Sequence, residues 1–180
     1  MQNTWTIKDK KFDKYISAEE IQNAIRTMAS RINHELNGKK PLFIVILNGA
    51  FIFASDLIKK VKIDCEVTFV KLSSYAGTQS TGEVKEILGL DIDVAGRTVV
   101  VVEDIVDTGL TLQGFLETLK KQNPAEIKIA TCLLKPDAFK MKFPVEYLCF
   151  SIPNDFVVGY GLDYDGLGRN SSDIYKICEE

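Results

Sequence analysis

The spacing of apolar residues changes along the chain, and these changes predict where helices and strands lie. One stripe of apolar residues has helical spacing, at Ile21, Ile25, Met28 and Ile32. This stripe predicts an amphipathic helix over 18–37. Ser17 with Glu20 forms a capping-box sequence before it, and Gly38 stands where a C-terminal cap belongs.

The segments that follow alternate between apolar runs and amphipathic stretches. LFIVIL at 42–47 is apolar on both faces, as expected of a central parallel strand. After Pro136 the pattern loosens into short pieces rich in aromatic residues and glycine. The order of elements predicts an α/β fold, with a mainly parallel central sheet flanked by helices in a single domain over 1–180. Further strands are predicted at 65–72, 97–103 and 126–135, and further helices at 50–60 and 110–123.

Composition and charge narrow the class of partner. The chain has 180 residues, of which 46% are hydrophobic and 26% charged, and a net charge of −3. This balance gives no general attraction to nucleic acid or to an anionic membrane. The first 13 residues are polar, and no apolar stretch approaches the ~18 residues of a membrane span. We therefore expect a cytoplasmic protein with a small-molecule partner, and neither nucleic acid nor membrane.

Cysteine and histidine usage argues against several kinds of site. The four cysteines are scattered without a C-x-x-C pair, at Cys65, Cys132, Cys149 and Cys178. Neither a zinc site nor a disulfide framework is indicated by this spacing. The single histidine, His34, lies off the apolar stripe of its helix and is expected to be solvated.

The segment VVVVEDIVDTGLTL, residues 99–112, carries the clearest chemistry. In open α/β sheets ligands bind beyond the carboxyl ends of the strands, and here Glu103, Asp104 and Asp107 stand at such an end. The helix that follows presents unpaired N–H groups that can bind a phosphate, and glycine lets the backbone approach it closely. An acidic turn that only caps a helix would explain Asp107 but not Glu103 and Asp104. A ligand with a phosphate, a diol and a bound Mg²⁺ would suit both parts of this segment. Its phosphate would bind at the helix start, and its hydroxyl groups and metal would contact the carboxylates.

The same segment resembles the phosphoribosyl-pyrophosphate motif of type I phosphoribosyltransferases, in which two acidic residues and D-T-G-x-T follow a hydrophobic strand. The resemblance widens to the hypoxanthine(-guanine) phosphoribosyltransferases over roughly residues 40–175. Residues 47–57, LNGAFIFASDL, look like the pyrophosphate-binding loop of that family, and 73–85, SSYAGTQSTGEVK, look like its mobile loop. Its purine-binding segments are similar to 133–139, LLKPDAF, and 153–170, PNDFVVGYGLDYDGLGRN.

The resemblance implies a reaction and its requirements. A 5-phosphoribosyl group would pass from phosphoribosyl pyrophosphate to an imidazole nitrogen of hypoxanthine or guanine, giving IMP or GMP and pyrophosphate in purine salvage. Mg²⁺ is the implied cofactor, and a homodimer or homotetramer the implied assembly. The implied fold is that of the type I enzymes, with a small irregular hood formed by the N-terminal segment and roughly 136–180.

The resemblance also implies a role for individual residues. Asp107 would act as the base or hydrogen-bond partner at purine N7, with Ser74 and Tyr75 closing over the reacting centre. Purine binding would fall to Ile105, Lys135, Phe156, Val157 and Asp163, and metal binding to Glu103, Asp104 and Asp163. Phosphoribosyl pyrophosphate would be bound by Leu47, Asn48, Gly49, Glu103, Asp104, Asp107, Thr108, Gly109, Leu110, Thr111 and Arg169.

The roles implied for Lys135, Arg169, Phe156 and Val157 are chemically reasonable, although the assignment of Phe156 rests mainly on the resemblance. Lys135 would stabilise negative charge that grows on the exocyclic oxygen of the purine. The planar guanidinium of Arg169 suits the oxygens of pyrophosphate. Phe156 would stack on the base, while Val157 would bind it through backbone groups.

One position departs from the family pattern. The pyrophosphate loop of the family commonly has lysine where this chain has Asn48, so a positive charge near a polyanion is missing. The resemblance implies a non-proline cis peptide at this point, and we expect the backbone to bind pyrophosphate here. Asn48 would then contribute its peptide N–H and a neutral amide.

Two other classes of protein stay open. A transcriptional regulator built on the same fold would be expected to carry a basic face or an added DNA-binding segment, which the acidic balance does not favour. A phosphoribosyltransferase for another base, such as adenine, orotate or xanthine, is opposed by the segments around Lys135 and Phe156. The sequence leaves open the preference between hypoxanthine, guanine and xanthine.

Overall fold

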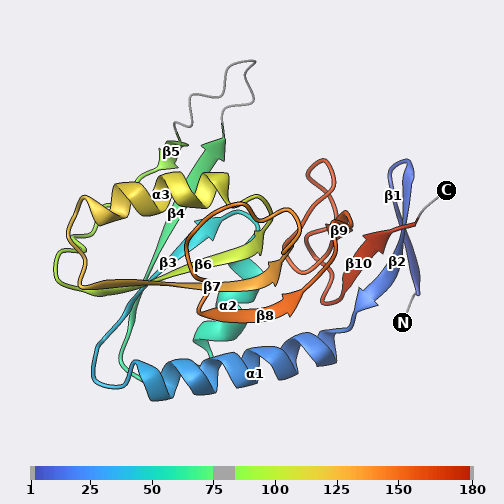
Figure 1. Ribbon diagram of the computed structural model, residues 1–180. Helices are drawn as coiled ribbons and strands as arrows, with labels where there is room; N and C mark the ends of the chain where they lie inside the picture. The colour runs from blue at the N-terminus through green and yellow to red at the C-terminus, as the bar shows by residue number, and fades with distance from the viewer. Residues whose placement is uncertain (1–2, 75–83, 179–180) are drawn as a thin grey trace.

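The computed structural model describes residues 3–74 and 84–178 and contains two sheets (Figure 1). The larger sheet has the strand order β5-β4-β3-β6-β7-β8. Its strands β4, β3, β6, β7 and β8 run parallel, and β5 pairs with β4 antiparallel at one edge. The strands are β3 (Leu42–Leu47), β4 (Glu66–Ser74), β5 (Val84–Leu88), β6 (Thr98–Val106), β7 (Glu126–Leu134) and β8 (Tyr147–Ser151). The predicted α/β fold with a mainly parallel sheet is confirmed.

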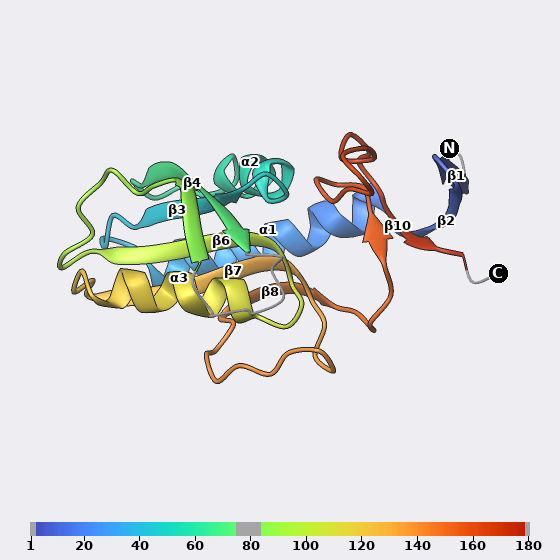
Figure 2. The same ribbon diagram turned by 90° about the horizontal axis from the view of Figure 1, so that it is seen from above.

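Helices cover both faces of this sheet, as Figures 1 and 2 show. α1 (Ala18–Glu35) and α2 (Phe51–Ile58) lie on one face, and α3 (Leu110–Lys120) lies on the other. Strand β3 explains why both faces are covered, because successive side chains point to opposite sides of a strand. Phe43 packs with α1 and α2, whereas Leu42 packs with α3.

The start of α1 confirms the predicted capping box. The Ser17 hydroxyl accepts from the backbone N–H of Glu20 at 3.3 Å. The backbone N–H of Ser17 donates in turn to the Glu20 carboxylate at 2.9 Å. Gly38 follows the helix with a φ of 78°, a left-handed conformation that glycine adopts at low cost. His34 is exposed, as its position off the apolar stripe predicted.

The second sheet forms a hood beside the carboxyl ends of the parallel strands (Figure 1). Its strands run antiparallel in the order β1-β2-β10-β9. They are β1 (Thr4–Ile7), β2 (Lys10–Ile16), β9 (Val157–Val158) and β10 (Ile174–Ile177). Asp173 connects the hood to the core, because it accepts a hydrogen bond from the Ala18 backbone at 2.7 Å and pairs with Lys14 at 2.7 Å.

Several boundaries differ from the sequence prediction. The strand predicted at 97–103 spans Thr98–Val106, so Asp104 lies within the strand and not beyond its end. The helix predicted at 110–123 ends at Lys120, and the one predicted at 50–60 spans Phe51–Ile58. The hood strands and β8 were not predicted individually, because each is short or pairs with distant segments.

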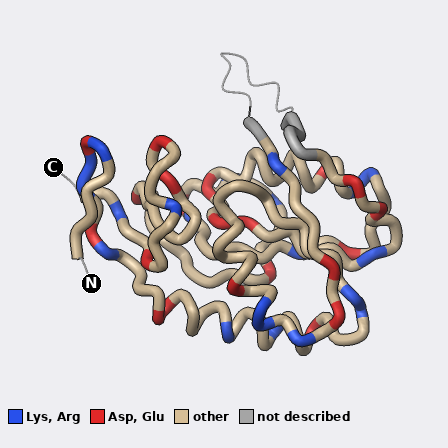
Figure 3. The backbone as a smooth tube through the Cα atoms, turned by 180° about the vertical axis from the view of Figure 1, so that it is seen from behind, with Lys and Arg blue, Asp and Glu red and all other residues tan. Residues whose placement is uncertain are grey.

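Positive and negative residues are mixed along the described chain. Figure 3 shows Lys and Arg interspersed with Asp and Glu along the chain. Among the helices of the described residues, none is both long enough and apolar enough to cross a membrane.

Candidate active site

Two carboxylates near the carboxyl end of β6 form the acidic part of the site. The Glu103 carboxylate accepts from the backbone N–H of Asp104 at 3.0 Å, and the Asp104 carboxylate accepts from that of Ile105 at 2.7 Å. Burial raises the pKa of both groups, and the neighbouring charge of Asp104 raises the pKa of Glu103 further. The guanidinium of Arg169 acts in the opposite direction on the pKa of Asp104. Bringing positive charge to this pair would therefore favour its ionised form.

The turn after β6 forms a cradle at the start of α3. Gly109 has a φ of 80° there and precedes the first residue of the helix, so its conformation is one that glycine favours. The Thr108 hydroxyl accepts from the Leu110 backbone at 3.4 Å, and Leu110 is exposed. A pocket of about 130 Å³ opens here, lined by Glu103 and residues 105–112. Unpaired N–H groups at a helix start and a small cavity suit a phosphate group.

Side chains from the segment after β7 pack against this cradle. This contact was not predicted from the sequence. A Cβ atom added at Gly109 would lie 2.9 Å from Phe139 and 2.9 Å from Met141. The backbone N–H of Lys140 donates to the carbonyl of Thr108 at 3.4 Å. Two reasons therefore favour glycine at 109, its backbone angle and this close approach.

The loop after β3 approaches the acidic pair. The Leu47–Asn48 peptide is cis, as the resemblance implied. A Cβ atom added at Gly49 would lie 1.5 Å from a carboxylate oxygen of Asp104. Residue 49 therefore lies against Asp104 with room for a hydrogen atom only, and Asn48 is exposed beside it.

The hood contributes a third segment, which contacts the loop after β3. A Cβ atom added at Gly161 would lie 2.0 Å from the carbonyl oxygen of Gly49. Arg169 donates to the carbonyl of Gly161 at 2.6 Å and pairs with the Asp163 carboxylate at 2.6 Å. The other oxygen of Asp163 accepts from the Gly166 backbone at 2.7 Å. Both oxygens of Asp163 are thus engaged within the hood.

The residues assigned to purine binding come from both the core and the hood. The buried side chain of Lys135 follows β7 and pairs with Asp107 at 3.1 Å. Phe156 is 43% exposed in the hood, and Val157 beside it is buried in β9. The Phe156 ring contacts Tyr164 edge to face, with 5.9 Å between ring centroids. Part of this ring is therefore open to a stacking ligand.

The structure places only some of the residues assigned to closure over the reacting centre and to metal binding. Ser74 is the last residue of β4, and Tyr75 lies outside the described residues. Within 3–74 and 84–178, no group of three or more His, Cys, Asp or Glu side chains could hold a metal ion. Asp163 is not brought together with Glu103 and Asp104 into such a group.

Comparison with known proteins agrees with this geometry. The phosphoribosyl transferase domain family matches residues 16–165. A hypoxanthine-guanine phosphoribosyltransferase of Mycobacterium bovis is 40% identical over 166 residues, covering 88% of this chain and 82% of the relative. One from Streptococcus thermophilus is 37% identical over 165 residues, covering 91% and 92% of the two chains.

Solved structures give the same picture. A hypoxanthine phosphoribosyltransferase from Staphylococcus aureus superposes with a TM-score of 0.88 at 36% identity, covering 92% of this chain and 91% of the other. One from Trypanosoma cruzi, in a ternary complex with substrates, has a TM-score of 0.87 at 34% identity, covering 92% and 94%. The chain belongs to the phosphoribosyl transferase family and groups within it with the hypoxanthine-guanine phosphoribosyltransferases.

Proposed function

We propose that the chain transfers a 5-phosphoribosyl group from phosphoribosyl pyrophosphate to hypoxanthine or guanine in purine salvage. The observation that carries this proposal is one continuous segment, in which the carboxylates of Glu103 and Asp104 lead directly into the cradle at 107–111. A donor with a phosphate at one end of its ribose and a diol at the other matches that order of groups. The relatives named for the same activity support it.

The decisive experiment is a pyrophosphate-release assay with a panel of bases. Hypoxanthine or guanine, added with phosphoribosyl pyrophosphate and Mg²⁺, is expected to release pyrophosphate, whereas adenine and orotate are not. Xanthine belongs in the panel because the choice among 6-oxopurines is open. Release with none of the 6-oxopurines would refute the proposed function. No feature of the described residues favours a transcriptional regulator.

In this proposal the donor spans the contact between core and hood. Backbone N–H groups at 108–111 hold the 5-phosphate, helped by the hydroxyls of Thr108 and Thr111. Glu103 and Asp104 face the ribose hydroxyls, and their negative charge favours a sugar that becomes cationic in the transition state. The loop at 47–49 and Arg169 hold the pyrophosphate group.

Purine binding would separate the ion pair between Asp107 and Lys135. Their 3.1 Å contact places a carboxylate and an ammonium side by side at the ends of β6 and β7. Asp107 would take the proton from N7, and Lys135 would turn toward the exocyclic oxygen. As the ribosyl carbon bonds to the other imidazole nitrogen, its bond to pyrophosphate breaks and the electron pair leaves with pyrophosphate.

The acidic pair fits a divalent cation. Mg²⁺ is commonly bound by one or two carboxylates together with substrate phosphates and waters. Glu103 and Asp104 are adjacent carboxylates whose ionised forms are disfavoured by burial, and a cation would relieve this. When bound, Mg²⁺ would neutralise charge on the donor and the carboxylates. Asp163, which the resemblance also assigned to the metal, would first have to leave Arg169.

Binding of the donor is therefore expected to depend on Mg²⁺. In calorimetric titrations we expect affinity for phosphoribosyl pyrophosphate to fall by at least ~10-fold, about 1.4 kcal/mol, when excess chelator is present. Equal affinities with Mg²⁺ and with chelator would contradict the assignment. The variant Asp91→Asn, which changes an exposed carboxylate outside the site, should keep the same dependence.

A lysine at position 48 is expected to change turnover little. If the loop binds pyrophosphate through its backbone, Asn48→Lys should alter kcat at saturating donor by less than ~10-fold, about 1.4 kcal/mol. Steady-state assays of the two proteins measure this directly. A large gain from the lysine would show that the side chain at 48 matters more than the main chain.

The assembly implied by the resemblance, a homodimer or homotetramer, belongs to the same proposal. Light scattering coupled to size exclusion distinguishes the two from a monomer.

A further inference from the structure

Tyr160 joins the hood to the core in a way that the proposed reaction does not use. Its side chain is 3% exposed, and its hydroxyl donates to the Asp56 carboxylate in α2 at 2.7 Å. Its φ of 51° is left-handed, a conformation that residues other than glycine seldom adopt. Such angles persist where the surrounding structure enforces them, often near functional sites. Tyr160 is held in this unusual position by contacts at both ends.

Asp56 is a fixed acceptor for this hydroxyl. It also pairs with Lys59 at 2.6 Å and accepts from the Gln22 amide at 2.5 Å. Burial alone would raise the pKa of Asp56, but the hydrogen bonds from Lys59, Tyr160 and Gln22 hold this pKa below its usual value. Burial and the bond to Asp56 raise the pKa of Tyr160. The carboxylate is therefore ionised and the phenol protonated at neutral pH, which is the arrangement that a short hydrogen bond requires.

The backbone of Tyr160 lies beside the residues proposed to hold pyrophosphate. Its N–H donates to the carbonyl of Ser171 at 2.9 Å, and the N–H of Gly161 donates to the carbonyl of Arg169 at 3.0 Å. Arg169 donates back to the carbonyl of Gly161 at 2.6 Å. Gly161 also contacts the carbonyl of Gly49 closely enough to exclude a Cβ atom.

Asp56 and Gly49 belong to the same stretch of chain, since α2 begins two residues after Gly49. The turn at 159–161 is thus held to this stretch at two points. One is the contact between Gly161 and Gly49, and the other is the hydrogen bond between Tyr160 and Asp56. Two fixed points determine both the distance of the turn from the loop and its orientation.

We propose that Tyr160, through Asp56, is a positioning residue for the pyrophosphate end of the donor. The hydrogen bond fixes the turn at 159–161, to which Arg169 is hydrogen-bonded, against the loop at 47–49, so both sides of the pyrophosphate subsite keep their spacing before the donor arrives. This inference rests on the proposed assignment of that loop and Arg169 to pyrophosphate. The side chains proposed to bind the purine, Lys135 and Phe156, are not partners in the bond between Tyr160 and Asp56.

Tyr160→Phe tests the inference, because it removes the hydroxyl and keeps the ring. We expect the KM for phosphoribosyl pyrophosphate to rise on the order of tenfold, since a hydrogen bond to a charged group is lost. The KM for pyrophosphate in the reverse reaction should rise by a similar factor. The KM for hypoxanthine should change by less than about twofold, because the purine contacts are intact. An unchanged KM for the donor, or equal rises for donor and purine, would overturn the inference.

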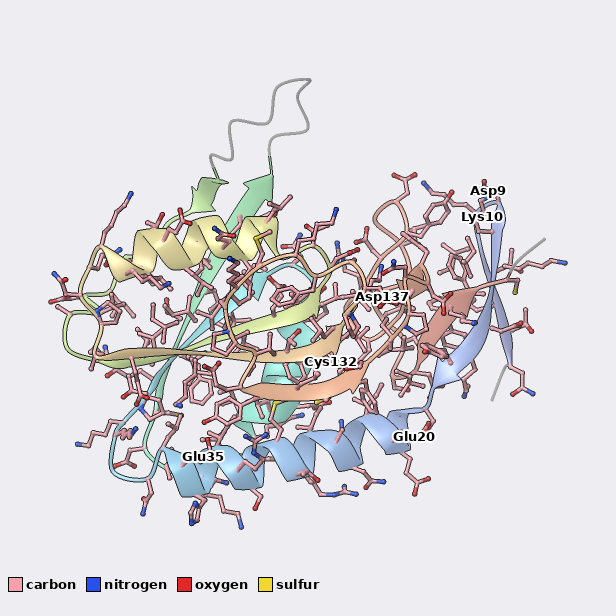
Figure 4. All side chains as sticks on the ribbon, in the orientation of Figure 1. Asp9, Lys10, Glu20, Glu35, Cys132 and Asp137 are labelled. Atoms are coloured by element: carbon pink, nitrogen blue, oxygen red, sulfur yellow. The ribbon has the colours of Figure 1, made fainter. Side chains whose placement is uncertain are left out.

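Tyr147→Phe is a matched control. Tyr147 is also buried, and its hydroxyl donates to the Glu35 carboxylate at 2.9 Å. Figure 4 labels Glu35 at the end of α1 that lies away from the hood. Tyr147→Phe should lower the melting temperature to a similar extent as Tyr160→Phe and leave each KM unchanged. If both variants raise the donor KM equally, the effect of Tyr160→Phe is one of general stability and the inference fails.

Two further variants complete the test. Asp56→Asn keeps an oxygen that can accept from Tyr160, so its donor KM should rise less than that of Tyr160→Phe; a larger rise would overturn the inference. Arg169→Ala tests the underlying assignment. If Arg169→Ala raises the pyrophosphate KM and Tyr160→Phe does not, the positioning role fails while the proposed function stands. If neither variant raises it, the assignment of this subsite fails as well.

Discussion

Gly49→Val is expected to reduce turnover by at least ~10³-fold, about 4 kcal/mol, while the protein still folds. A side chain at 49 would begin 1.5 Å from a carboxylate oxygen of Asp104, so either the loop or Asp104 must move. Moving the loop displaces the backbone proposed to bind pyrophosphate, and moving Asp104 disrupts the pair proposed to face the ribose. Steady-state kinetics with circular dichroism on the same preparation measure both activity and folding.

A second glycine provides the control for this prediction. Gly38 follows α1 with a φ of 78°, and a Cβ atom there would meet nothing within 4 Å. Gly38→Ala should therefore lower the free energy of unfolding by ~1 kcal/mol through its backbone angle, with turnover unchanged. A tolerated valine at 49 would show that the loop does not need this close approach, and would contradict backbone binding of pyrophosphate.

The central part of the fold could be predicted because its signals are local. The strand Leu42–Leu47 was predicted with its observed bounds, since a run that is apolar on both faces leaves few alternatives. The capping box at Ser17 was equally clear, because both of its partners lie within one turn of helix. Neither element needs a distant partner to be recognised.

The end of β6 was misplaced because acidic residues usually interrupt a strand pattern. Here Glu103 pairs with Thr131 and Val106 with Leu134 in β7, so the strand continues beyond Glu103, where the prediction ended it. The carboxylates of Glu103 and Asp104 bond to the next backbone N–H and are partly buried. A neighbouring strand in register thus decided the boundary, and the local pattern contains no information about that neighbour.

The hood could not be predicted as a sheet for the same reason. Its strand β2 pairs Lys14 with Tyr175, far apart in the sequence, and β9 is only Val157–Val158. Short strands that pair over such separations leave little periodicity to detect. The contact between Gly161 and Gly49 has no sequence signal beyond the abundance of glycine in GYGLDYDG.

The candidate site was predicted as a set of residues, but not as a set of contacts. Lys135 and Asp107 were assigned to different atoms of the purine, and the structure pairs them with each other. Asp163 was assigned to the metal and is found with Arg169. Both pairings join opposite charges, which a motif that assigns the residues separate roles does not reveal.

The pairing of Lys135 with Asp107 bears on the second large effect that we expect. Asp107→Asn should lower kcat by ~10²–10⁴-fold, the usual contribution of a positioned acid or base, because an amide cannot accept the N7 proton. An asparagine keeps an oxygen for Lys135 and nearly the same volume, and the side chain of Asp107 is 51% exposed. The melting temperature should therefore change little.

Two controls separate a base from a structural cap. Asp91→Asn changes another exposed carboxylate, outside the site, and should leave kcat within about twofold. Calorimetric affinity of Asp107→Asn for phosphoribosyl pyrophosphate should stay within about threefold of the original, because backbone N–H groups form the cradle. A kcat near that of the original protein would refute proton transfer to Asp107. If donor affinity falls in parallel with kcat instead, Asp107 holds the cradle in shape, and another group must receive the proton.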